Sequence, residues 1–202
     1  MIEKKATDIR QEEIIRATLA VAAEHGVSGI TVKRVAEKVG LSPAALYRHF
    51  AGKDEVLSAV QDFLSDRIGP AIMEALSAKS PLAGVRSLFE RIVAAINEHR
   101  MLPVVMISQD VWGEHPQNRK KMRQNFEMLH NGLTKLFEAA RVAGEIRGDI
   151  DVTKLPLLFV GLYVPPALLS IRMPDLVDFQ EQVQANWELF ERAIVSETYR
   201  RP

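Results

Sequence analysis

Hydrophobic residues recur at every third or fourth position along most of the chain, and runs that alternate apolar and polar residues, as β-strands do, are missing. The first periodic stretch predicts a helix from about Thr7 to Gly26. Two very short helices are expected next, at about 31–39 and 43–49, before a longer one that begins near Lys53. Because proline removes a backbone hydrogen bond, we expect Gly69-Pro70 to disturb this longer helix. The pattern indicates an all-α protein.

The rest of the chain keeps the helical pattern. Prolines suited to a first helical turn mark three helix starts, at Pro81, Pro103 and Pro116. The segment 155–171 is apolar on almost all sides and holds two consecutive prolines, where a kink or break is expected. A final helix at about 175–199 carries a single apolar stripe. The chain is therefore expected to comprise about nine helices.

Residues 31–50 have the form of a helix-turn-helix. Gly40 suits the positive φ of a tight turn, and a serine followed by a proline suits the cap and first turn of the second helix. Leu46 and Phe50, four positions apart, would anchor that helix inward. Its outward side chains are small or polar, so the helix could enter the major groove, which is roughly 12 Å wide. These candidate DNA contacts are Ser42, Pro43, Ala44, Ala45, Tyr47, Arg48 and His49.

The same segment also has a local excess of basic residues. The whole chain has 26 basic and 26 acidic residues, so only a local excess can indicate a nucleic-acid partner. Between residues 31 and 53, Glu37 is the single acidic residue among five basic ones, a balance typical of a phosphate-binding surface. Lys33, Arg34 and Lys53 therefore join the candidate contacts. On these residues alone, a helical corner with a solvated basic face is the alternative interpretation.

A longer set of motifs extends over residues 14–57. It consists of Ile14-Ile15-Arg16-Ala17-Thr18-Leu19, Glu24-His25-Gly26, Thr31-Val32, Val35-Ala36, Gly40-Leu41-Ser42, Leu46-Tyr47-Arg48-His49-Phe50 and Lys53-Asp54-Glu55-Val56-Leu57. In order and spacing these motifs closely resemble the N-terminal domain of the TetR family of transcriptional repressors. The resemblance implies a DNA-binding domain at residues 1–52, in which Thr31 caps a helix and touches a phosphate. It also implies base contacts from the small residues of the second helix, and backbone contacts from Tyr47, His49 and Lys53.

The same resemblance implies that residues 53–202 form a helical domain that binds an effector and dimerises through its last two helices. Two recognition helices could then read a palindrome in successive major grooves, about 34 Å apart. The segment 155–171 supports a dimer independently, because one face against its own domain cannot bury a helix that is apolar all round; a central core helix is the alternative. The interface candidates are Leu158, Leu162, Leu169, Phe179, Val183, Trp187 and Phe190.

Aromatic residues, methionines and a few polar residues of this larger domain are candidates for an effector pocket. They are Phe89, Met106, Gln109, Asp110, Trp112, Phe126, Leu129, His130, Phe159 and Tyr163. Taken singly, each is more commonly a core residue, and the mild preference is for an apolar or amphipathic effector. The resulting hypothesis is a ligand-responsive, dimeric repressor that the effector releases from palindromic operator DNA. A constitutive DNA-binding protein whose larger domain only dimerises, or an enzyme of small apolar substrates, are the alternatives.

Several other classes find no support in the residues. The chain has no cysteine, which excludes disulfides and cysteine-ligated metals, and no two histidines lie three or four positions apart as in a helical metal site. We therefore expect no metal and no cofactor, and none of the common nucleophile, dinucleotide or phosphate-loop motifs of enzymes is present. Residues 1–13 mix charges without an apolar block, so a cytoplasmic protein without a membrane partner is expected.

Overall fold

The computed structural model describes the backbone of residues 2–112, 115–197 and 199, with side chains from residue 12 onward. These residues form helices and turns, and the one extended pairing among them is an isolated bridge between Ile146 and Val195. The prediction of an all-α protein is confirmed. By its contacts the chain forms two compact units, the first made of residues 1–66 and 99–125 and the second of residues 67–98 and 126–202. This division differs from the expected domain boundary at residue 52.

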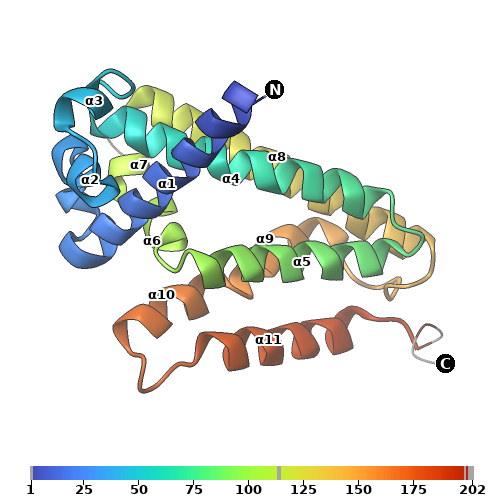
Figure 1. Ribbon diagram of the computed structural model, residues 1–202. Coiled ribbons are helices and arrows are strands. Elements are labelled where there is room, and N and C mark those ends of the chain that lie inside the picture. The colour runs from blue at the N-terminus through green and yellow to red at the C-terminus, as the bar shows by residue number, and fades with distance from the viewer. Residues whose placement is uncertain (1, 113–114, 198, 200–202) are drawn as a thin grey trace. The chain divides into compact units, whose positions relative to one another are not determined.

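The first unit is built around the N-terminal helices, which gather together in Figure 1. Its helices are α1 (Ile2–His25), η1 (Val27–Gly29), α2 (Val32–Val39), α3 (Pro43–Tyr47), the first part of α4 (Lys53–Leu76), α6 (Leu102–Met106), α7 (Gln109–Trp112) and the first part of α8 (Pro116–Val142). Their apolar stripes meet in a core in which Ile15, Val35, Leu46 and Leu57 have no exposed surface. Burying a side chain of this size contributes about 1.5–3 kcal/mol.

The second unit has an aromatic core. Its helices are the remainder of α4 and α8, α5 (Pro81–Glu98), η2 (Val152–Lys154), α9 (Leu155–Gly161), α10 (Val164–Arg172) and α11 (Phe179–Ile194). The ring of Phe89 on α5 lies 4.7 Å from that of Trp187 on α11 and 5.8 Å from that of Phe159 on α9, centroid to centroid. These contacts bring three helices distant in sequence around one centre, and burial there raises the pKa of the Tyr163 hydroxyl.

Some helix boundaries differ from those expected. Helix α1 begins at Ile2 instead of near Thr7, and α4 runs unbroken through Pro70. A single proline removes one hydrogen bond, and the turns on both sides of Pro70 keep the long helix intact. The expected helix that starts at Pro103 is divided, because Ile107 leaves helical geometry and Ser108 Oγ donates to the carbonyl of Val105 at 2.7 Å.

The expected break in the apolar segment 155–171 is confirmed. Helix α9 ends at Gly161, α10 begins at Val164, and the two prolines 165 and 166 lie in the first turn of α10, where a missing amide hydrogen costs nothing. This division into α9 and α10, and that of the helix expected at Pro103 into α6 and α7, explain why the described residues form more α-helices than the nine expected. The final helix is shorter than the expected range 175–199 because Asp178 caps it, accepting from the amide of Glu181 at 2.8 Å.

The segment 152–172 is long and apolar enough to cross a membrane by length and composition alone. The broken helix pair α9 and α10 occupies this segment, and 44% of its most apolar window is buried inside the protein. Core helices of soluble proteins pass the same test, so this segment is weak support for a membrane span.

Candidate nucleic-acid interface

Side-chain caps fix the two helices of the predicted helix-turn-helix. Thr31 Oγ1 accepts a hydrogen bond from the amide of Arg34 at 3.2 Å and so caps α2, as the family resemblance implied. Ser42 Oγ accepts from the amide of Ala45 at 3.1 Å and caps α3, whose first residue is Pro43. Between them Gly40 has a φ of 77°, in the left-handed region that favours glycine. The turn predicted from the sequence is confirmed at each of these positions.

The outward side of α3 carries small and polar side chains, as the sequence predicted. Leu46 is fully buried, which turns the helix so that Ser42, Ala44, Arg48 and His49 are exposed; Pro43 and Ala45 are partly buried. Tyr47 keeps 53% of its surface exposed, and no described residue holds its hydroxyl in a hydrogen bond. A side chain of this kind at the rim of a groove can donate to a phosphate. The interface therefore presents small side chains flanked by longer polar ones.

Two of the five basic residues counted in this segment are held by acidic partners. Lys38 forms an ion pair with Glu24 of α1, and this hydrogen bond lowers the pKa of the Glu24 carboxyl. Lys53 Nζ, at the start of α4, donates to Asp110 Oδ1 of α7 at 2.6 Å. Lys33 and Arg34 are exposed, although Arg34 Nη1 also donates to the carbonyl of Gly29 at 2.8 Å. Their contacts with DNA stay predictions.

A testable prediction follows from the ion pair between Lys53 and Asp110. A DNA phosphate would compete with the Asp110 carboxylate for the ammonium group of Lys53. Asp110→Asn is expected to raise the affinity for duplex DNA about 1.4- to fivefold, since partly exposed pairs are worth roughly 0.2–1 kcal/mol. The salt dependence of binding should steepen by about one phosphate contact. Affinity measured by fluorescence anisotropy at several salt concentrations checks both effects.

The double variant Lys53→Ala with Asp110→Asn is the matched control for this measurement, and it should show no gain over Lys53→Ala alone. If Asp110→Asn instead weakens DNA binding, the carboxylate positions Lys53 for the phosphate and does not compete with it.

The ten candidate effector residues are distributed over both units. Met106, Gln109, Asp110 and Trp112 belong to the first unit, where Trp112 Nε1 donates to the carbonyl of Met106 at 2.9 Å. The other candidates belong to the second unit: Phe89, Phe126, Leu129, His130, Phe159 and Tyr163. Among these the structure brings together the rings of Phe89, Phe159 and Tyr163, with centroids 5.8 to 6.4 Å apart. Their role in effector binding stays a prediction.

The predicted dimer-interface residues fall into two groups. Leu162, Phe179, Val183, Trp187 and Phe190 are buried in the core of the second unit, and their part in a dimer stays a prediction. The apolar stripe of α11 faces its own unit, because Trp187 packs on Phe89. Leu158 and Leu169 are 52% and 42% exposed and stay available to a partner.

Sequence reasoning missed Gln61 of α4. Its side chain has no exposed surface, and neither atom of its amide has a hydrogen-bond partner among the described residues. The signal was present in the sequence, because Gln61 interrupts the apolar stripe that includes Leu57 and Leu64, four positions before and three after. A polar residue on such a stripe indicates a buried polar group that needs an explanation.

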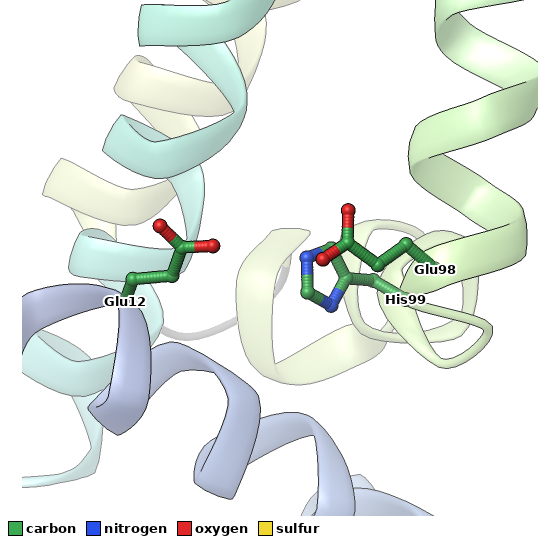
Figure 2. A group of neighbouring side chains, drawn as sticks. All are labelled: Glu12, Glu98 and His99. Atoms are coloured by element: carbon green, nitrogen blue, oxygen red, sulfur yellow. The ribbon is translucent and has the colours of Figure 1, made fainter. Parts of the chain in front are cut away.

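Figure 2 shows three side chains of a kind that can ligate metals: Glu12 on α1, and Glu98 and His99 where α5 ends. Within the first unit, the ring of His99 packs edge-on against that of Phe63, with centroids 5.2 Å apart, and His99 is 6% exposed. This packing is typical of a core histidine. The expectation of a protein without a metal stays a prediction.

Comparison with known proteins finds a family model that matches the N-terminal segment. Residues 14–60 match the model of the bacterial regulatory proteins, tetR family. The chain is also 23% identical over 197 residues to the nucleoid occlusion factor SlmA of Idiomarina loihiensis, a match that covers 97% of this chain and 100% of that protein. The matched segment contains the capped helix pair α2 and α3 described above.

Solved structures share the fold. The TetR family transcriptional regulator PfmR from Thermus thermophilus superposes with a TM-score of 0.69 at 21% identity, over 86% of this chain and 91% of that one. A complex of SmeT with triclosan gives 0.70 at 19% identity, over 95% and 94%. FadR from Bacillus subtilis in complex with stearoyl-CoA gives 0.70 at 17% identity, over 88% and 96%. Residues 14–60 thus match the model of the bacterial regulatory proteins, tetR family, and the whole chain shares its fold with these solved structures.

Proposed function

We propose that the protein is a transcriptional repressor that binds palindromic operator DNA as a homodimer and is released by a small apolar or amphipathic effector. The observation that carries the proposal is the exposed face of α3, where the small side chains of the capped first turn are followed by the exposed Tyr47. Such a face fits a major groove, and the exposed basic residues of α2 and those that directly follow α3 supply phosphate contacts. A cytoplasmic protein is part of this proposal, because its operator lies there.

The experiment that tests DNA reading is selection of duplexes from a random pool by the purified protein, followed by sequencing of the winners. A palindromic consensus and an affinity that falls steeply with salt are the expected results. If nothing palindromic is enriched, a dimeric reader is ruled out and the exposed face of α3 serves another purpose.

Exposed apolar side chains on α9 and α11 support dimerisation. Leu157 and Leu158 of α9 are 65% and 52% exposed, and Leu189 of α11 is 66% exposed. The two helices are joined where Asn186 Nδ2 donates to the carbonyl of Leu162 at 2.9 Å, one helical turn from Leu158 and from Leu189. An exposed apolar surface on two linked helices is typical of an interface between two copies of a chain.

Leu158→Glu is expected to weaken the dimer at least about tenfold, because two-fold symmetry places the carboxylate twice in the interface and burying a charge is costly. Sedimentation equilibrium of the variant and the wild type measures this dissociation constant. Val142→Glu, which adds the same charge at a residue of α8 that is 84% exposed, is the control and should leave it unchanged. Equal weakening by both variants would point to net charge as the cause, and a dimer unaffected by Leu158→Glu must use another surface.

An effector of apolar character is supported by the neighbours of known fold. The solved relatives include a complex with triclosan and one with stearoyl-CoA, both of which carry large apolar groups. In this chain, the cluster of Phe89, Phe159, Tyr163 and Trp187 offers apolar surface in the second unit, and the first unit offers methionines and one unpaired amide.

A second candidate function is that of a DNA-binding protein without an effector. The full-length similarity to a nucleoid occlusion factor favours it. Mapping of bound sites across the genome separates the two candidates, because a regulator of transcription should occupy a few promoters, whereas a nucleoid-associated role predicts many sites distributed along the chromosome.

A further inference from the structure

The amide of Gln61 is the least satisfied polar group among the described residues of the first unit. The residue has no exposed surface, and both Nε2 and Oε1 lack a hydrogen-bond partner. Each buried polar atom without a partner costs about 1–3 kcal/mol. Glutamine is mostly an exposed residue type, so full burial of an unpaired amide in the middle of α4 calls for a group that is not part of the chain.

The backbone around Gln61 is held by hydrogen bonds, so Gln61 does not lie in a loosely packed region. The main-chain carbonyl of Gln61 accepts from Ser65 Oγ at 3.0 Å and from Asn125 Nδ2 of α8 at 3.3 Å. One turn earlier, Lys121 Nζ donates to Ser58 Oγ at 2.6 Å and pairs with Asp62. These bonds pair Lys121 and Asn125 of α8 with groups of α4, whereas the side-chain amide of Gln61 has no partner among the described residues.

The surroundings of this amide are apolar and adaptable. On the same face of α4, Leu57 belongs to the core of the first unit and Leu64 packs against that core. The same core contains Met106, with Met101 and Met122 packed against it. Methionine is flexible and polarisable, so a core with three of them can reshape around an apolar molecule more easily than one of branched side chains.

We propose that Gln61 binds the polar head of the effector, and that this head is a neutral group with a donor and an acceptor side by side, such as a carboxamide, attached to an apolar body. This inference rests on the proposed function, since it names the class of effector. A carboxamide donates to Oε1 and accepts from Nε2, and thereby satisfies both orphaned atoms of Gln61. An alcohol does the same with one oxygen.

An ionised carboxylate is the informative contrast. It accepts from Nε2 but has no hydrogen to donate to Oε1, and it must leave water to enter an apolar interior. An alkane reaches the same apolar surface without pairing either atom. The expected order of affinity is therefore amide, then alcohol, with carboxylate and alkane clearly weaker.

The test uses the full-length protein with hexanamide and decanamide, the matching alcohols and carboxylates, and the parent alkanes. Binding is measured by calorimetry, and release from the selected duplex by anisotropy. For wild type, the better amide should bind at least about tenfold more tightly than the carboxylate and alkane of equal length, the factor that one good hydrogen bond supplies. In Gln61→Leu this preference should fall to within about twofold, while the melting temperature without ligand rises.

Gln117→Leu, at an exposed glutamine of the same unit, is the matched control and should keep the wild-type preference. The inference is overturned if no compound binds, if Gln61→Leu keeps the preference for the amide, or if Gln61→Leu melts at a lower temperature, which would show that the amide already has a partner. The affinity for the duplex, measured without any compound, distinguishes failure of this inference from failure of the proposed function. Wild type that binds DNA but no compound contradicts only the effector class, whereas wild type that binds no duplex contradicts the function itself.

Discussion

Ala44→Glu is expected to lose at least about 100-fold in affinity for the selected duplex while keeping its fold. Ala44 is exposed in the first turn of α3, on the side that the buried Leu46 turns outward. A carboxylate there would lie among the base edges and close to phosphates, so two like charges meet where the wild type places a methyl group. Losses of 1–3 kcal/mol are usual for a single lost base contact, and an added charge repulsion should exceed that.

The same substitution should leave folding intact. An acidic residue in the first turn of a helix is favoured by the helix dipole, so the melting temperature should stay equal or rise slightly. The control is Ala139→Glu, which adds the same charge at an exposed position of α8 and should bind the duplex like wild type. Anisotropy with the selected duplex gives the affinities, and circular dichroism gives the melting temperatures. Unchanged affinity of Ala44→Glu would remove α3 from the interface.

The helix-turn-helix could be predicted because local chemistry determines it. The caps at Thr31 and Ser42 and the left-handed turn at Gly40 each depend on residues within a few positions along the chain. The resemblance of residues 14–57 to a known family added the expected order of these parts. Nothing distant in sequence had to be known for this segment.

The partner of each apolar stripe could not be predicted in the same way. Periodicity showed that α11 has one apolar face, but the same pattern fits a dimer interface and a core. In the structure this face packs in the core of its own unit, where the ring centroids of Phe89 of α5 and Trp187 of α11 lie 4.7 Å apart. Such a contact joins residues nearly a hundred positions apart, and a single sequence shows no sign of it.

The prolines illustrate the same limit. The break before residues 165 and 166 was predicted, since two prolines begin a helix readily and continue one poorly. Pro70 was expected to disturb α4 and does not end it. The cost of one missing hydrogen bond can be offset by packing along the rest of a long helix, and that packing depends on the tertiary structure.

Gly84→Ala is expected to destabilise the protein by about 1–3 kcal/mol, the usual cost of forcing atoms into a packed interior. A Cβ at Gly84 of α5 would lie 2.4 Å from the carbonyl oxygen of Ala75, near the end of α4. The start of α5 is fixed nearby, since the amide of Leu82 donates to Glu145 Oε2 at 2.7 Å. Because the clash is with backbone, no side-chain rotation relieves it.

The sign of this effect makes the measurement decisive. In an unobstructed helix, glycine to alanine stabilises by roughly 0.5–1 kcal/mol, so a loss of stability on urea unfolding can come only from the close approach of α5 to the end of α4. Gly148→Ala is the control: a Cβ there meets no atom within 4 Å, and the free energy of unfolding should change by less than about 0.5 kcal/mol. If Gly84→Ala were stabilising, α5 would have to lie farther from the Ala75 carbonyl in solution. The packing of Phe89 of α5 against Trp187 would then have to be looser as well.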